Sequence, residues 1–106
     1  MSARNINHAE FQELVAGAKP VLVDFWAPWC GYCRRIEAVY EQVADQHEEL
    51  VVTKVNIDEE ADLAAQQQID VIPTLVLYRG GEVLDSVVAP GSKAAIDEFI
   101  RQALAK

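Results

Sequence analysis

Two stretches in the first half of the chain repeat apolar residues at helical spacing. The first begins at Asn7, which has Glu10 three positions later as a capping-box partner, and its apolar positions continue to Ala18 before a Lys-Pro pair. The second begins near Cys33 and continues along one face as far as Leu50. These patterns predict two amphipathic helices.

Strand patterns lie between these helices and after them. Val21–Trp26 is a continuous apolar run, typical of a central strand that is covered on both faces. Val51–Asn56 is rich in β-branched residues and predicts a second strand. Residues 75–79 and 82–88 flank a Gly-Gly pair, which favours a hairpin because glycine accepts positive φ.

The order of these elements predicts an α/β layered fold. Asp58 is expected to cap a short helix that ends near Gln67, and Ser92 a last helix with an apolar face around Phe99. The result is a central mixed sheet of four to five strands flanked by about four helices, with a right-handed parallel crossover. We expect residues 1–106 to form one domain.

Composition and charge narrow the class of protein. Hydrophobic residues make up 51% of the 106 residues, enough for a core without disulfide staples. The net charge of −8 argues against binding to nucleic acid or to anionic membranes, both of which attract clustered Lys and Arg. No apolar window is long enough to span a bilayer, and residues 1–5 lack the apolar core of a signal peptide. We therefore expect a cytoplasmic monomer.

The only two cysteines form a Cys-x-x-Cys pair between the first strand and the second helix. This placement is typical of a redox pair. Side chains three positions apart on a helix are neighbours, and Gly31 eases the small adjustment that a disulfide needs. Cys30 lies at the helix N-terminus, where free amides and the nearby Arg34 and Arg35 favour a thiolate. We therefore expect Cys30 to be the nucleophile and Cys33 the resolving thiol.

Other interpretations of the cysteine pair are weaker. A zinc site needs about four ligands, and only His8 and His47 are available, at poor spacing. Attachment of c-type haem needs His after the second cysteine, where the chain has Arg34. Two buried, inert cysteines remain an alternative, although their position beside Trp29 argues against burial. We expect no metal and no cofactor.

Asp24 is the only charge in the first strand. If it is buried, desolvation raises its pKa and makes it a candidate proton acceptor for the resolving thiol, through water. A carboxylate turned to solvent at a strand edge is the alternative. Lys54 occupies the same position in the second strand, so parallel pairing would bring the two together; a solvent-facing lysine is the alternative.

The motifs of the chain resemble those of the thioredoxin family. The sequence Val-Asp-Phe-Trp-Ala-Pro-Trp-Cys-Gly-x-Cys occupies residues 23–33, Ile-Pro-Thr follows at 72–74, and the order of elements matches over essentially the whole chain. The resemblance implies that Asp24 is the family's buried acid, that Lys54 is its neighbour, and that Pro73 is in cis.

The resemblance also implies a substrate-docking rim around the nucleophile. The residues that match it are Trp29, Gly31, Ile72, Val88 and Ala89. We use "docking rim" for these residues together with Tyr32 and Pro73, which we also expect to bind substrate. The implied partners are proteins that contain disulfides and a thioredoxin-reductase-like electron donor.

Three positions depart from the family pattern. Tyr32 replaces the proline of Cys-Gly-Pro-Cys and keeps a backbone N–H, which can stabilise the Cys30 thiolate and so make the disulfide more oxidising. Ala38 stands where the family has a helix proline, so we expect less of a kink. Ala89 replaces a glycine and precedes Pro90, which can narrow or redirect substrate choice.

Three functions are compatible with these patterns. The leading one is a general protein-disulfide reductase. The second is a disulfide isomerase or oxidant, because Cys-Gly-Tyr-Cys resembles the active-site tetrapeptide of bacterial periplasmic disulfide isomerases. The third is a non-catalytic binding subunit that uses the same surface as a clamp, although such a subunit needs neither cysteine.

Overall fold

A five-stranded mixed sheet forms the centre of the molecule, which we describe for residues 3–106 from a computed structural model. The spatial order of the strands is β1-β3-β2-β4-β5. β3 is parallel to both β1 and β2, whereas β4 is antiparallel to β2 and β5. The strands are β1 (Arg4–Asn5), β2 (Val21–Trp26), β3 (Val51–Asn56), β4 (Thr74–Arg79) and β5 (Glu82–Val88).

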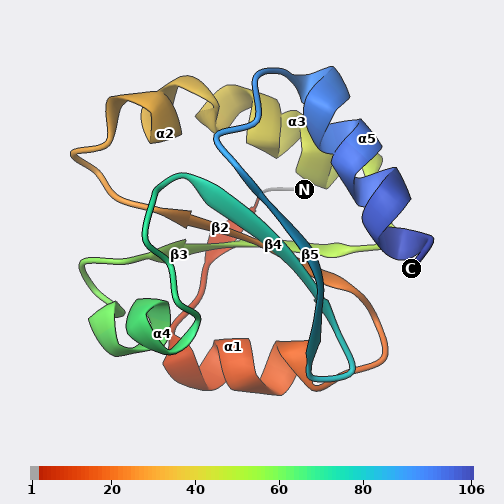
Figure 1. Ribbon diagram of the computed structural model, residues 1–106, viewed down its shortest axis with the longest axis horizontal. Helices are drawn as coiled ribbons and strands as arrows, with labels where there is room; N and C mark the ends of the chain where they lie inside the picture. Colours follow the sequence, from red (N-terminus) through yellow and green to blue (C-terminus); the bar gives the residue numbers. More distant parts are fainter. Residues whose placement is uncertain (1–2) are drawn as a thin grey trace.

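Helices cover both faces of this sheet (Figure 1). α1 and α4 lie on one face and α3 and α5 on the other, while α2 lies at one end of the sheet next to α3. The helices are α1 (His8–Val15), α2 (Gly31–Arg35), α3 (Glu37–Gln46), α4 (Ala61–Gln66) and α5 (Lys93–Leu104). The predicted α/β architecture with a mixed sheet is confirmed.

Each helical layer packs on its own apolar cluster. On the α3/α5 face, Tyr40, Leu77 and Ile96 are fully or almost fully buried. On the α1/α4 face, Phe11 and Leu63 pack with strand side chains in the same way. Because both faces are covered, β2 carries a nearly continuous run of buried residues, as the sequence predicted.

The long helix expected from Cys33 to Leu50 is wrong. Ile36 interrupts it with φ −91° and ψ 0°, so α2 ends at Arg35 and α3 begins at Glu37. The smaller kink expected from the absence of a proline at Ala38 stays a prediction. The Ile36 side chain is buried, and its carbonyl still accepts a 2.8 Å hydrogen bond from the Tyr40 amide. The break between α2 and α3 thus coincides with a buried Ile36 side chain, and the hydrogen bond to its carbonyl is kept.

Two other helices start or end differently from the prediction. The first helix stops at Val15, whose carbonyl accepts a hydrogen bond from the Gly81 amide of the hairpin loop. The Gly80 amide donates to the Gly17 carbonyl, just beyond the end of the helix. The short helix begins at Ala61, and its predicted cap is used elsewhere, since the Asp58 carboxylate accepts the indole N–H of the docking rim's tryptophan. Capping signals in the sequence are local, so they cannot reveal hydrogen-bond partners that are distant along the chain.

Several predicted local details are confirmed. The capping box of Asn7 and Glu10 is present at α1, and the Ser92 side chain caps α5. Both loop glycines of the hairpin have positive φ, 62° at Gly80 and 83° at Gly81. Strand β1, only two residues long, was missed because so short a segment carries no periodic signal.

Candidate active site

The two cysteines are joined by a disulfide at the start of α2. Their Cα atoms lie 5.3 Å apart, and Cys30 is the N-cap residue, whose Sγ accepts a 3.2 Å hydrogen bond from the Cys33 amide. Cys30 is 8% exposed and Cys33 3% exposed. Cys30 is thus the more accessible of the two. Both cysteines are nevertheless buried, so the expectation that the position beside Trp29 argues against burial is wrong.

A backbone carbonyl faces the more accessible sulfur. Cys30 Sγ lies 3.9 Å from the carbonyl oxygen of Ile72, and the peptide bond from Ile72 to Pro73 is cis. The segment between β5 and α5 also lies beside the cis-proline, because the Ala89 amide donates a 2.9 Å hydrogen bond to the Pro73 carbonyl. Residues far apart in the sequence are thereby brought together around Cys30.

The exposed part of this region is apolar. Trp29 is 68% exposed and Val88 53% exposed, whereas Ile72 packs against the cysteine cluster. The indole N–H of Trp29 donates to both Asp58 carboxylate oxygens, at 3.0 and 3.2 Å, so its ring is held in one orientation. An ordered apolar surface of this kind suits docking of another polypeptide.

The buried carboxyl group predicted in β2 is present. Asp24 is 3% exposed, and its Oδ1 has no hydrogen-bond partner among the described residues. Burial raises the pKa of Asp24 to about 7, with the positive charge of Lys54 working against the shift and the negative charge of Glu37 adding to it. Asp24 therefore changes protonation near neutral pH.

Lys54 lies beside Asp24, and the alternative of a solvent-facing lysine is wrong. The two residues are Cα partners in the parallel β2–β3 pairing, and the Lys54 side chain is only 13% exposed. Its Nζ is 4.0 Å from carboxylate oxygens of both Glu37 and Glu41 and 5.5 Å from the centre of the Trp26 ring. Lys54 thus lies near two carboxylates, and its positive charge also acts on Asp24.

Tyr32 contributes in a way that the sequence did not indicate. Its hydroxyl group donates a 2.9 Å hydrogen bond to the carbonyl oxygen of Pro90. In the disulfide form, the amide that donates a hydrogen bond to Cys30 Sγ is that of Cys33, not the Tyr32 amide that the sequence suggested. No local pattern could have revealed a side-chain contact across 58 positions.

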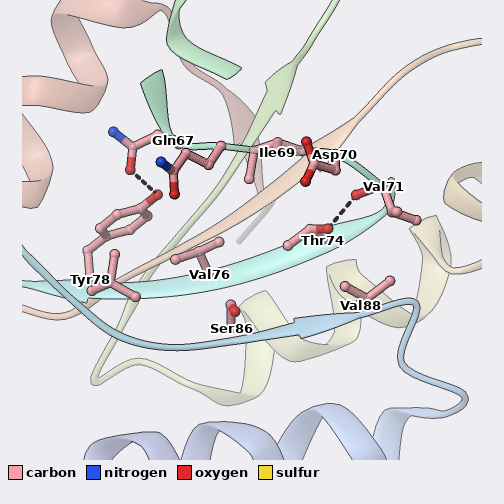
Figure 2. A pocket seen from close by; sticks show the side chains of 11 residues that line it. Gln67, Ile69, Asp70, Val71, Thr74, Val76, Tyr78, Ser86 and Val88 are labelled. Atoms are coloured by element: carbon pink, nitrogen blue, oxygen red, sulfur yellow. Dashed lines mark hydrogen bonds between the residues drawn. The ribbon is translucent and has the colours of Figure 1, made fainter. Parts of the chain in front are cut away.

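A groove of about 460 Å³ adjoins the docking rim (Figure 2). Val71, Thr74 and Val88 line one end of it, and the Thr74 hydroxyl donates to the Val71 carbonyl. At the other end Tyr78 donates a 2.8 Å hydrogen bond to Gln67. The groove escaped sequence analysis because its walls come from the α4–β4 connection and from β4 and β5.

Residues 3–106 offer neither a cluster suited to a metal nor a helix suited to a bilayer. They contain no group of three or more His, Cys, Asp or Glu side chains that could hold an ion. None of their helices is long and apolar enough to cross a membrane.

Fold and site together define a thiol–disulfide oxidoreductase, with a cysteine pair at a helix start, a cis-proline beside Cys30 and a buried acid in the central strand β2. The family model described as thioredoxin matches residues 2–102. The chain belongs to the thioredoxin family, and it has the fold and the protein-disulfide oxidoreductase activity of that family.

Individual relatives agree with this assignment. Thioredoxin 1 of Nostoc sp. is 43% identical over 94 residues, which cover 88% of each chain. The bifunctional thioredoxin reductase/thioredoxin of Mycobacterium leprae is 39% identical over 87 residues, 81% of this chain and 19% of that protein. The structure of Malassezia sympodialis thioredoxin superposes with a TM-score of 0.88 at 32% identity, covering 96% of this chain and 90% of that one.

Proposed function

We propose that the chain is a general protein-disulfide reductase in which Cys30 attacks and Cys33 resolves. The Cys30 thiolate forms a bond to one substrate sulfur, the substrate S–S bond breaks, and the other substrate sulfur leaves as a thiolate. Cys33 then attacks Cys30 Sγ and releases the second substrate thiolate. Two electrons pass to the substrate, and the protein is left as the Cys30–Cys33 disulfide. The greater accessibility of Cys30 supports this assignment.

We assign Asp24 as the acceptor of the Cys33 proton, with Lys54 tuning its pKa. The observation that supports this is a buried carboxyl group with a pKa of about 7 and an oxygen without a partner among the described residues. Asp24→Asn should slow release of substrate from the mixed disulfide about ten- to a hundredfold at pH 7. Rapid-quench trapping of the mixed disulfide measures this, with Asp70→Asn on the surface as control. Equal release rates for Asp24→Asn and the unaltered protein would exclude the role.

We assign substrate docking to the rim defined above, with the near end of the groove (Val71 and Val88) extending it. Exposed apolar side chains around a buried sulfur support this assignment. Trp29→Ala should raise KM for insulin at least severalfold, because large aromatic side chains dominate docking energetics. Insulin turbidity assays with dithiothreitol as reductant provide the measurement. An unchanged KM would contradict docking at Trp29.

We propose a thioredoxin-reductase-like protein as the electron donor, in the cytoplasm, with the chain acting as a monomeric single domain. The fused reductase and thioredoxin of M. leprae support the donor class. The test is reduction of insulin by the chain with such a reductase and NADPH. If the chain reduces insulin with dithiothreitol but not with the reductase and NADPH, the thiol–disulfide chemistry stands and the proposed electron donor is excluded. Light scattering and cell fractionation test the monomer and the compartment.

The alternative is an isomerase or oxidant, and Tyr32 is the residue that favours it. Proteins of this type have higher potentials, about −180 mV for protein disulfide isomerase against about −270 mV for thioredoxin. We expect a value between these two, and a shift toward the lower one in Tyr32→Pro. Equilibration with glutathione gives the potential. A value at or below that of thioredoxin would contradict the argument from the Tyr32 amide, and refolding of scrambled ribonuclease would test isomerase activity directly.

A further inference from the structure

The hydroxyl group of Tyr32 joins α2 to the segment between β5 and α5. It donates a 2.9 Å hydrogen bond to the carbonyl of Pro90, which is buried. The guanidinium of Arg35, one turn further along α2, lies 6.0 Å from the centre of the Tyr32 ring, within cation–π range. The ring is therefore held by its own helix while its hydroxyl reaches across to the other side of the docking rim.

That other side carries an unusual backbone conformation. Ala89 has φ +46°, in the left-handed region that favours glycine, and such a residue persists only where its surroundings hold it. Two hydrogen bonds on consecutive residues do so. The Ala89 amide donates to the Pro73 carbonyl at 2.9 Å, and the Pro90 carbonyl accepts from Tyr32. Pro90 has no amide proton, so its carbonyl is the backbone group through which it can be fixed.

We propose that Tyr32 is a positioning residue, which holds the Val88–Pro90 side of the docking rim in its substrate-binding conformation through the hydrogen bond to Pro90. The inference rests on the docking role proposed for the rim. A surface that is ordered before binding loses less conformational entropy when a partner docks. The hydroxyl should therefore lower KM for substrates that cover the rim. It should matter little for a small disulfide, which needs only the sulfur.

The test uses Tyr32→Phe in the full chain, because this change keeps the ring and the backbone amide and removes only the hydroxyl. We expect KM for insulin to rise about three- to tenfold, the effect of losing one such hydrogen bond, with kcat within about twofold. The rate with hydroxyethyl disulfide and the reduction potential should match those of the unaltered protein. Hydrogen exchange at the Ala89 amide should become faster.

Two further variants separate this inference from its premises. Tyr78→Phe removes a phenolic hydrogen bond to Gln67 at the far end of the groove and should leave KM unchanged. Val88→Ser tests the rim itself. If Val88→Ser raises KM and Tyr32→Phe does not, the positioning role is overturned and the rim stands. If neither raises KM, the docking role of the rim fails as well. Parallel losses with insulin and hydroxyethyl disulfide in Tyr32→Phe would place the hydroxyl in the sulfur chemistry and also overturn the proposal.

Discussion

At the scale of single residues, the burial of Asp24 couples the stability of the fold to pH. The pKa of this carboxyl is about 7 in the folded protein, against 3.8 for an unperturbed aspartic acid. Between these two pH values the folded state binds more protons than the unfolded state, so the free energy of unfolding falls as pH rises and the loss is complete above pH 7. Most carboxyl groups in folded proteins behave in the opposite way.

Asp24→Asn should therefore stabilise the protein in alkali and leave it little changed in acid. The expected gain above pH 7 is on the order of 4 kcal/mol, from about three pKa units at 1.36 kcal/mol each. Urea unfolding of the oxidised protein at pH 4, 7 and 9 measures it. Asp70→Asn, at an exposed position, is the control. A difference from the unaltered protein that does not vary with pH would contradict the assignment of the shift to Asp24.

Ala89 offers a second test at this scale. Replacing Ala89 with glycine removes the cost of a left-handed alanine, about 1–2 kcal/mol. Glycine also makes the unfolded chain more flexible, which offsets part of this gain in stability. We expect Ala89→Gly to raise the free energy of unfolding by about 0.5 kcal/mol. Ala94→Gly, exposed in α5, should lower it by about 1 kcal/mol. Equal losses in the two variants would mean that the backbone at Ala89 is not strained.

At the scale of elements, His47 connects the end of α3 to α5. Its Nδ1 lies 2.9 Å from Glu49 and its Nε2 2.8 Å from Asp97, which also pairs with Lys93. Burial lowers the pKa of His47, but the hydrogen bonds and charges of Glu49 and Asp97 outweigh burial and raise it above its usual value. A raised histidine pKa stabilises the fold below the unfolded-state pKa, and this contribution disappears as pH rises through the folded-state pKa.

His47→Gln should thus cost more stability at pH 5.5 than at pH 8.5. A difference of about 1 kcal/mol between the two pH values is expected for a partly exposed pair. Urea unfolding at both pH values gives the numbers. The same substitution in an Asp97→Asn background should show a smaller pH dependence, because one partner is already neutral. A His47 effect that does not depend on pH would show that the histidine acts by packing alone.

Element boundaries also mark the limit of what the sequence could predict. β2 and β3 were predicted with the bounds that the structure has, since an apolar or β-branched run is a local signal. The break at Ile36 and the late start of α4 were not, because they depend on burial and on an indole 29 residues away from Asp58. Local patterns identify elements, and tertiary partners decide where they end.

At the scale of the whole molecule, the sequence could predict the part of the site that depends on how neighbouring strands pair. Asp24 and Lys54 hold equivalent places in two strands, and parallel pairing made them neighbours. The cis bond before Pro73 was implied by family resemblance and not by the pattern itself. The Tyr32–Pro90 hydrogen bond and the groove beside β5 depend on how three chain segments meet, which no local pattern encodes.

The hairpin loop has a practical consequence for handling the protein. β2 runs from Val21 toward the disulfide, and β4 runs back from it, so the turn before β2 and the hairpin loop share the opposite end of the sheet. The Gly80 amide fastens the two loops together through the Gly17 carbonyl. The exposed Lys19 beside them is thus a suitable attachment point for a bead or a dye, which would leave the redox end facing outward and accessible to large substrates.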